Sequence, residues 1–526
     1  MHQSNYIPIV DLFAGPGGLG EGFSSVNDGK AFKILVSAEM DGAAHSTLKL
    51  RAFYRNLKLK GVDALNSYYN FCNGITLKPY DDNTLSAWEH ACSEAQQLTL
   101  GIEADNKKLY SIIDKAGLSK AKPWLLIGGP PCQAYSLVGR ARNRGKEGYK
   151  AEEDDRHYLY REYLKVIQKY KPAVFVMENV KGILSSKIEG KMIFHSILQD
   201  LSDPDSALGH KCDVGYKIYS LTLPTVFKRG MDPNSINVHD FIIRAEDYGI
   251  PQARHRVILI GVREDLNNRP GQLKKSDSIL SVKDAIGNLP ALRSRLSKRE
   301  DSSGNWQAVV NKHIEELLAE AELNESLSEL AKVFKEAAKK LSKHIDYGAL
   351  RLKITDNNHW GTSDLHQWYR DDRLTHWLNH ETRGHMTSDL RRYIYASSFA
   401  KVNGISPKGH EQFNLKGLKP NHDNWETGKF ADRFRVQLYD RPSTTVTSHI
   451  SKDGHYFIHP DPAQCRSLTV REAARLQTFP DNYFFQGNRT QQYHQAGNAV
   501  PPFLARKIGE IVANFLDKEN SDITEI

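Results

Sequence analysis

Short apolar runs alternate with amphipathic stretches over the first 55 residues. Residues 7–13 form an apolar run that ends in a glycine-rich turn, and residues 32–39 form a second run. Each is followed by a stretch with helical spacing, at residues 17–26 and 41–54. Strands that alternate with helices in this way are typical of a parallel sheet covered by helices. We therefore predict an α/β fold that begins at the N-terminus.

The same alternation returns further along the chain. Further strands are predicted at residues 124–129, 173–178, 240–245 and 256–262, with a helix at 155–170. Residues 56–120 show no comparable rhythm, and we interpret them as an insertion. A second insertion is predicted at residues 222–238.

The pattern changes after residue 263. Two charged helices are predicted, HIEELLAEAEL and SLSELAKVFKEAAKKLSKH, with a break at residues 324–326. A segment dense in Trp, His, Tyr and Arg follows at residues 359–386, and we interpret residues 264–439 as a second domain. Helices are then predicted at 468–480 and 502–516, and we expect the acidic tail after Asp517 to fray.

Composition limits the class of protein. The 526 residues are 40% hydrophobic and 25% charged, which is ordinary for a soluble folded protein. No apolar run approaches the roughly 18 residues of a membrane span, and the N-terminus lacks the pattern of a secretory signal. The five cysteines form no CxxC pair, so we expect neither a disulfide framework nor a zinc site. This cysteine usage is typical of a protein in a reducing compartment. The formal charge of +8 is compatible with a polyanionic partner without requiring one.

A glycine-rich loop follows the first predicted strand, in the sequence DLFAGPGGLG at residues 11–20. The loop formally satisfies GxGxxG, and Glu39 ends the next strand, so a nicotinamide or flavin enzyme is one interpretation. A plain turn that packs a helix on a strand is the alternative. Pro16 removes a backbone N–H that a phosphate would bind, which favours a nucleoside ligand without phosphates.

Three further groups lie at or beside predicted strands. Cys132 stands in GGPPCQAYS, where it is either a nucleophile or an inert thiol, and a basic glycine-rich loop follows at residues 139–150. That loop is either solvated or able to close over a phosphate-bearing substrate. Glu178 ends the strand FVMENV, where a carboxylate needs a partner or a task. Arg254 and Arg256 alternate in QARHR, which places two guanidiniums on one face of a strand. They either bind a carbonyl oxygen, a carboxylate or phosphates, or they form an exposed pair at the edge of the sheet.

With these groups in this order, the chain resembles the cytosine-C5 DNA methyltransferase family. Three later segments share the resemblance: RPSTTV at 441–446, LTVREAARLQTFP at 468–480 and QAGNAVPP at 495–502. The resemblance covers residues 1–55, 121–263 and 430–515. It implies a Rossmann-like methyltransferase domain with a mostly parallel sheet, made of residues 1–263 and completed by residues 440–526. Residues 264–439 would then be the target-recognition domain, with the two charged helices as an insertion.

The resemblance also implies a mechanism. Cys132 would attack C6 of a cytosine flipped out of double-stranded DNA, and Glu178 would hold and protonate N3. Arg254 and Arg256 would hold the base, with Arg256 as the candidate for the O2 contact. C5 would then take a methyl group from S-adenosylmethionine.

Further contacts are implied for the cofactor and for DNA. The cofactor would lie against Phe13, Gly15, Gly17, Gly18, Asn498 and Val500, with Glu39 on the ribose hydroxyls. Asp114 is the candidate for the adenine amine. DNA contacts are implied for Gln133, Ser136, Arg140, Arg142 and Arg156.

Other interpretations remain. Some relatives methylate tRNA, but the long region between QxRxR and the return segment favours DNA. An oxidoreductase would give no role to Cys132, Glu178 and the paired arginines together, and a silent binding module would not need the nucleophile and the acid. We expect a bacterial, cytoplasmic modification enzyme that acts as a monomer, with any restriction endonuclease acting separately. The sequence does not reveal which DNA site is methylated.

Overall fold

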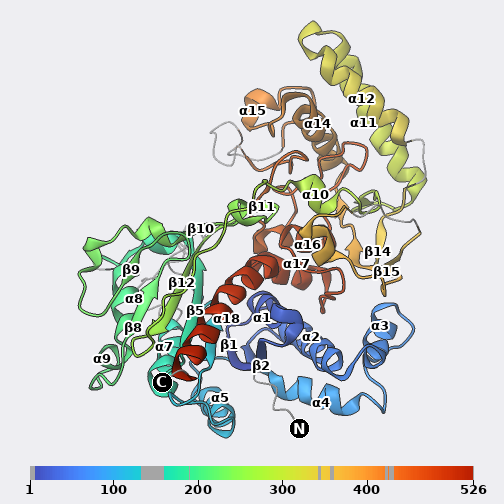
Figure 1. Cartoon of the computed structure of the whole chain (residues 1–526). Coiled ribbons are helices and arrows are strands. Elements are labelled where there is room, and N and C mark those ends of the chain that lie inside the picture. Colours follow the sequence, from blue (N-terminus) through green and yellow to red (C-terminus); the bar gives the residue numbers. More distant parts are fainter. Residues whose placement is uncertain are drawn as a thin grey trace.

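The computed structural model describes residues 6–131, 159–188, 190–341, 345–355, 361–420, 425 and 432–524. Figure 1 shows a twisted sheet with helices on both faces, and a second body of helices and short strands above it in this view. No helix among these residues combines the length and apolar character needed to cross a membrane.

The central sheet contains nine strands in the described part of the chain. Its path runs β3 (Ala95–Gln97), β2 (Phe32–Glu39), β1 (Ile7–Leu12), β4 (Leu125–Gly128), β5 (Val174–Val180), β12 (His255–Arg263), β8 (Tyr216–Tyr219) and β9 (Val226–Phe227), and β10 (Ile242–Arg244) also pairs with β12. The strands from β3 to β5 are parallel. β12 runs antiparallel to β5, β8 and β10. The predicted α/β fold with a mostly parallel sheet is confirmed.

The central strands are apolar on both faces because helices cover both, which is why they appear in the sequence as continuous apolar runs. One face packs against α1 (Gly18–Ser24) and α18 (Pro502–Thr524). The other packs against α5 (Glu103–Lys115), α7 (Leu159–Tyr170) and α8 (Ile193–Ser202). In Figure 1 the first and last of these helices, α1 and α18, lie beside each other.

The predicted insertion at residues 56–120 is partly wrong. Helix α2 (Gly42–Lys60) extends into it and is followed by α3 (Asn66–Cys72) and α4 (Leu85–Glu94). β3 then adds a parallel edge strand beside Ser37–Glu39 of β2, and α5 covers the sheet. The strand was missed because Ala-Gln-Gln carries no apolar pattern, so only its pairing with β2 makes it a strand.

The second body contains the two charged helices. They are α11 (Ser303–Glu322) and α12 (Ser328–Leu341), joined by a short 3-10 turn at Glu325–Leu327, as the predicted break requires. Both pack on α14 (Thr387–Asn403) through a separate apolar cluster. Two hairpin-like strands lie nearby, β14 (Gly348–Lys353) antiparallel to β15 (His376–Glu381). The remaining short elements include α10 (Val282–Ile286), α13 (Asp364–Tyr369), α15 (Gly409–Gln412), β13 (Arg295–Leu296) and β16 (Gly384–His385).

The predicted boundary at residue 263 does not separate the apolar cores. Val282 of α10 and Leu365 and Tyr369 of α13 belong to the same core as α1 and α18. The division into residues 1–263, 264–439 and 440–526 therefore stays a prediction.

The C-terminal part returns to the sheet. It contains β17 (Ser443–Thr444), which pairs with β11 (Gln252–Ala253), and the helices α16 (Val470–Leu476) and α17 (Arg489–Asn498). The tail that was expected to fray is helical to Thr524. It is held because the buried carboxylate of Glu519 accepts the backbone N–H groups of Asn267 and Asn268.

Candidate active site

The glycine-rich loop leaves the carboxyl end of β1 in an unusual backbone conformation. Phe13, Gly15 and Gly17 have φ values of 56°, 58° and 95°. Glycine adopts this left-handed region without strain, whereas Phe13 pays a cost of about 1–2 kcal/mol. The turn is fixed by hydrogen bonds from the Ala14 N–H to the Ala38 carbonyl and from the Gly17 N–H to the Ala14 carbonyl.

Glu39 connects this loop to the carboxyl end of β2. Its Oε2 accepts the Gly15 N–H at 2.8 Å, and its Oε1 accepts the Asp41 N–H at 2.8 Å. Burial raises the pKa of Glu39, and these N–H groups oppose that rise. Each oxygen keeps a further lone pair, so the carboxylate can also accept hydroxyl donors.

The backbone of the loop is open at Gly15. A Cβ atom added to Gly15 would meet no atom within 4 Å, so the loop faces open space there. A cradle of backbone next to a carboxylate suits a ligand with two neighbouring hydroxyl groups and no phosphate. The predicted cofactor residues Phe13, Gly15 and Glu39 therefore come together on one edge of the sheet.

The return segment closes the other side of the loop. A Cβ atom on Gly18 would lie 2.1 Å from the Val500 carbonyl oxygen, so only glycine permits this packing. The Tyr483 hydroxyl donates to the Pro16 carbonyl from the same side. Asn498 is different, because its exposed side chain lies 3.3 Å from the ring of His494. The structure thus brings Val500 to the loop by its backbone, while the Asn498 side chain contacts its own helix.

Glu178 and Arg256 meet across neighbouring strands. Val180 of β5 pairs with Arg256 of β12, which places the Arg256 Nε 2.9 Å from the Glu178 Oε1. Both side chains are largely buried, with 13% and 14% of their surface exposed. Burial lowers the pKa of Arg256, and the Glu178 carboxylate partly restores it.

The second oxygen of Glu178 faces the start of the cysteine segment. A Cβ atom on Gly129 would lie 3.1 Å from the Glu178 Oε2, and the Asn179 amide donates to the Pro130 carbonyl. The end of β5 therefore holds the turn that leads from β4 into Pro131. Cys132 itself lies outside the described residues, as do Gln133, Ser136, Arg140, Arg142 and Arg156.

Arg254 occupies a different environment from Arg256. Its side chain is buried, and its guanidinium donates to the Val446 carbonyl at 2.7 Å and to the Gly497 carbonyl at 3.4 Å. Burial lowers the pKa of Arg254. The sequence predicted that the two guanidiniums lie on one face of a strand, but Arg254 and Arg256 contact different partners. Residue 254 falls between β11 and β12, and its side chain turns toward the return segment.

Gln252 was quoted in the sequence motif but given no role. It is fully buried, donates to the Leu476 carbonyl and the Gln477 side chain, and accepts the Val446 N–H at 2.7 Å. Together with Arg254 it fastens the QARHR segment to the return segment. The sequence signal for this role was a glutamine just before a strand predicted to be buried. A buried amide needs hydrogen-bond partners, so such a glutamine is expected to bind another segment.

The assignment of Asp114 to the adenine amine is wrong. Asp114 ends α5, lies 3.7 Å from the Lys169 Nζ and is half exposed. Asp114 precedes β4 in the chain and Lys169 precedes β5, so both lie toward the edge where these parallel strands begin. Glu39 lies at the opposite, carboxyl edge of the sheet. The position of α5 relative to the sheet was not visible because β3 was not predicted.

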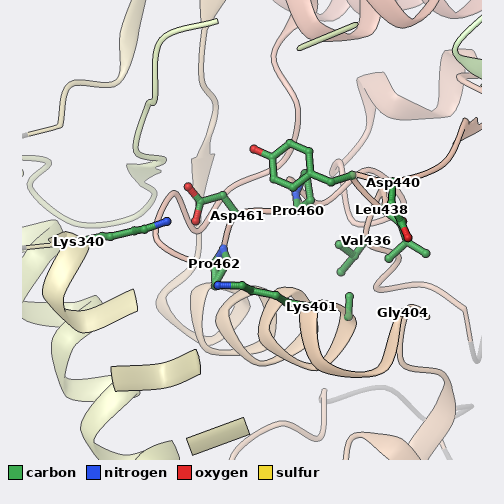
Figure 2. Close-up of a pocket in the computed structure, with 11 residues that line it drawn as sticks. Lys340, Lys401, Gly404, Val436, Leu438, Asp440, Pro460, Asp461 and Pro462 are labelled. Atoms are coloured by element: carbon green, nitrogen blue, oxygen red, sulfur yellow. The ribbon is translucent and has the colours of Figure 1, made fainter. Parts of the chain in front are cut away.

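A pocket of about 320 Å³ lies elsewhere, in the second body. Figure 2 shows it between α12, α14 and the loops at residues 436–440 and 460–462. Lys340 of α12 and Lys401 of α14 line it together with Asp461 and Asp440. Among the described residues, none of the predicted site residues lines this pocket, and its mixed charges favour neither an anion nor a cation.

Comparison with known proteins decides the family. A family model described as C-5 cytosine-specific DNA methylase matches residues 97–514. The chain belongs to the C-5 cytosine-specific DNA methylase family. The predicted family and the predicted enzyme class, a DNA (cytosine-5-)-methyltransferase, are thereby confirmed, and the nicotinamide or flavin alternative is excluded.

Relatives of this methylase cover its whole length. The type II methyltransferase M.Bpa9945I of Bacillus paralicheniformis is 31% identical over 97% of this chain and 99% of its own. The type II methyltransferase M.AgeI of Thalassovita gelatinovora is 26% identical over 96% and 98% of the two chains. A crystal structure of a candidate DNA modification methyltransferase encoded within an E. coli prophage has a TM-score of 0.50 at 19% identity, covering 97% of this chain and 99% of that one. This last likeness supports the Rossmann-like fold.

Proposed function

We propose that this methylase transfers a methyl group from S-adenosylmethionine to C5 of a cytosine within a specific sequence of double-stranded DNA. The observation that carries the proposal is the pair of Glu178 and Arg256 at the carboxyl edge of the sheet, beside the turn that leads to Cys132. A carboxyl group, a guanidinium and a thiol around one flat pocket are the groups that activation of a cytosine ring requires.

Each group has a role in this proposal. The Cys132 thiolate forms a bond to C6, while the Glu178 carboxyl group holds N3 and supplies a proton to it. Arg256 donates to O2 and keeps Glu178 in place through its Nε. The electron pair of the C5–C6 double bond shifts to C4–C5 as N3 takes the proton, so C5 becomes nucleophilic. C5 would then take the methyl group, and the demethylated donor, S-adenosylhomocysteine, would be the leaving group. Loss of the C5 proton to solvent, departure of the thiolate from C6 and return of the N3 proton to Glu178 restore the aromatic ring.

The two oxygens of Glu178 divide this work. Oε1 lies 2.9 Å from Arg256, whereas Oε2 faces the turn at Gly129. The ion pair fixes the side chain before the base arrives, so little orientation is needed at the moment of reaction. The base has to leave the stack because C6 is inaccessible inside a duplex.

The glycine-rich loop is proposed to hold the methyl donor. S-Adenosylmethionine supplies an electrophilic methyl group when bound. Glu39 would accept its ribose hydroxyls, and the backbone at Phe13, Gly15, Gly17 and Gly18 would line the nucleoside, with Val500 and Asn498 on the return-segment side. Arg254 would keep that segment in place through the carbonyls of Val446 and Gly497.

The remaining parts of the proposal concern partners. DNA contacts are assigned to Gln133, Ser136, Arg140, Arg142 and Arg156, and target recognition to residues 264–439. The protein would act as a monomer in the bacterial cytoplasm, as the modification enzyme of a type II restriction–modification system. Any restriction endonuclease would act separately. The names of the relatives M.Bpa9945I and M.AgeI as type II methyltransferases support this setting.

A labelled methyl group tests the proposal. The protein is incubated with labelled S-adenosylmethionine and duplex DNA, with tRNA as the competing substrate, and the modified base is identified by mass. We expect 5-methylcytosine in DNA alone. Label confined to tRNA would contradict the proposed substrate.

The Cys132→Ser variant provides the matched control. A serine hydroxyl is a far weaker nucleophile than a thiolate, so methyl transfer should fall below detection. Binding of S-adenosylmethionine, measured by calorimetry, should stay within about twofold of the wild type, because residue 132 is assigned no cofactor contact. An equal loss of cofactor affinity would overturn the assignment of the nucleophile.

A further inference from the structure

Residues 62–73, which lie in the region first interpreted as an insertion, hold a distant segment of the second body in place. We call residues 62–73 the α3 bracket and residues 371–375 the docked segment. In Figure 1 α3 lies directly below β14 and β15. Leu374 of the docked segment and Leu378 of β15 are buried in one apolar cluster with residues of α2, of α3 and of the 3-10 turn between them, namely Phe53, Leu57, Leu65, Tyr68, Tyr69 and Cys72.

Asn73 holds the backbone on both sides of Leu374. Its Nδ2 donates to the Arg373 carbonyl at 3.0 Å, and its Oδ1 accepts the Thr375 N–H at 2.9 Å. One side chain therefore satisfies the two backbone groups that flank the buried leucine. Asparagine is suited to this because its amide offers a donor and an acceptor at once.

Two arginines of the second body reach back to the bracket. Arg373 donates to the Val62 carbonyl at 2.9 Å and to the Asn66 Oδ1 at 2.6 Å, and its guanidinium covers the ring of Tyr69. Arg351 of β14 donates to the carbonyls of Phe71 and Cys72 at the end of α3. A cation at that position also interacts favourably with the helix dipole.

Asp371 connects the docked segment to the catalytic side of the molecule. Its Oδ2 accepts the Tyr69 hydroxyl at 2.5 Å and the Asn482 Nδ2 at 2.6 Å. The Asn482 Oδ1 in turn accepts from Arg51 of α2, which pairs with Glu21 of α1. A continuous set of buried and partly buried polar contacts thus runs from the helix after the glycine-rich loop to the second body.

We propose that the α3 bracket sets the position of the DNA-recognition region relative to the cytosine pocket, with Asn73 and Arg373 as positioning residues for site discrimination. The inference rests on the proposed function, in which residues 264–439 read the DNA. A surface loop that lay beside the second body by chance would not make so many specific hydrogen bonds to one short segment. They join side chains about 300 residues apart, and they anchor the strand pair β14–β15 by its entry segment.

Hydrogen exchange tests the bracket without any assumption about the reaction. Asn73→Ala removes both bonds to the docked segment, and Asn83→Ala makes the same change at an exposed position of the same region. In the full-length protein, peptides that cover residues 371–376 should exchange about tenfold faster in Asn73→Ala and at the wild-type rate in Asn83→Ala. Peptides of the glycine-rich loop should not change. Equal exchange in both variants would overturn the bracket.

Site discrimination tests the consequence. Turnover is measured on a duplex that carries the methylation site mapped for the wild type, and on the same duplex with one base pair of that site changed. In Asn73→Ala we expect the preference for the mapped site to fall about tenfold, with cofactor affinity within twofold of the wild type. A fold defect would lower the rate on both duplexes equally and leave their ratio unchanged, and that outcome would overturn the positioning role.

A second pair of variants separates positioning from direct DNA contact. Arg373→Lys keeps the charge that a phosphate would feel but loses the forked contact to Val62 and Asn66. Asn66→Ala removes the Asn66 half of this contact from the other side, leaves the bond to the Val62 carbonyl and changes no charge. Similar losses of discrimination that are not additive in the double variant support the bracket, and additive losses overturn it. If the wild type transfers no methyl group to DNA, the proposed function fails, and the exchange experiment alone decides on the bracket.

Discussion

The ion pair of Glu178 and Arg256 is partly buried, so each charge depends on the other for its stability. Removing one partner of such a pair leaves an unpaired charge in a site of low polarity. The same arrangement keeps the carboxylate beside the turn at Gly129, where a base would enter. Under the proposed function, catalysis and local stability are therefore linked at Glu178.

Glu178→Gln should lower kcat by about 100-fold or more, because an amide cannot supply a proton to N3. The isosteric side chain still fills the space, so DNA binding measured by filter retention should change by less than about threefold. Thermal unfolding of the same variant controls for a general fold defect. Turnover equal to the wild type would contradict the role of Glu178 as the acid.

The sequence predicted part of this site well. Glu178 lies near the end of one predicted apolar strand and Arg256 at the start of another, and the pairing of β5 with β12 brings the two side chains to 2.9 Å. The contacts of Arg254 could not be predicted, because they are made to carbonyls of residues about 190 and 240 positions later. Asp114 was misplaced for a related reason, since its distance from the loop depends on an edge strand without an apolar signal.

At the scale of elements, the strands with continuous apolar runs were predicted close to their observed bounds. The expected strand at residues 32–39 and the break between the two charged helices are both present. β3 and the last turns of α18 were not predicted, because their sequences carry no hydrophobic pattern that indicates a strand or a helix. β3 depends on pairing with β2, and the end of α18 depends on backbone N–H groups from another segment.

The anchor at the end of α18 gives a prediction. Glu519→Ala should lower the free energy of unfolding by about 1–2 kcal/mol, because it leaves the N–H groups of Asn267 and Asn268 without their acceptor. The matched control is Glu510→Ala on the same helix, whose exposed pair with Arg506 should contribute less than about 0.5 kcal/mol. Urea unfolding compares the two variants. A larger loss in Glu510→Ala would contradict the anchor.

At the scale of the whole molecule, four buried histidines lie where the second body meets the return segment. Burial lowers the pKa of His380 to about 4 and of His459 to about 3, and it lowers the pKa values of His385 and His455 as well. In the unfolded chain these groups would titrate near 6.5. Between pH 6.5 and 4 the unfolded chain therefore binds more protons than the folded one.

The free energy of unfolding should consequently decrease as the pH falls through this window. Asp11 and Glu39 act in the opposite direction, because burial raises their pKa values above those of the unfolded chain. Between the unfolded and folded values they offset part of the decrease, and the four histidines outnumber these two carboxyl groups. Urea unfolding at pH 7.5 and at pH 5.5 measures the effect, and His380→Gln should reduce the difference between the two. Equal stability at both pH values would contradict the prediction.

The arrangement of the second body could not be predicted from the sequence. The apolar stripes of α11 and α12 indicated a helical pair, but Asn73, Arg373 and Asp371 gave no local sign of meeting. Such contacts depend on side chains that are brought together only by the complete fold. This is why the role of residues 56–120 became visible only in three dimensions.

The close packing of Gly18 on the Val500 carbonyl affects how the protein is made. A ribosome finishes the glycine-rich loop early, yet the backbone that closes over it is among the last to be synthesised. Throughout translation the loop therefore lacks one of its walls. A nascent chain, or one shortened by a premature stop codon before Val500, would contain Glu39 and Glu178 in its sequence and still have an incomplete pocket. The order of synthesis thus delays the complete pocket until nearly the whole chain has been made.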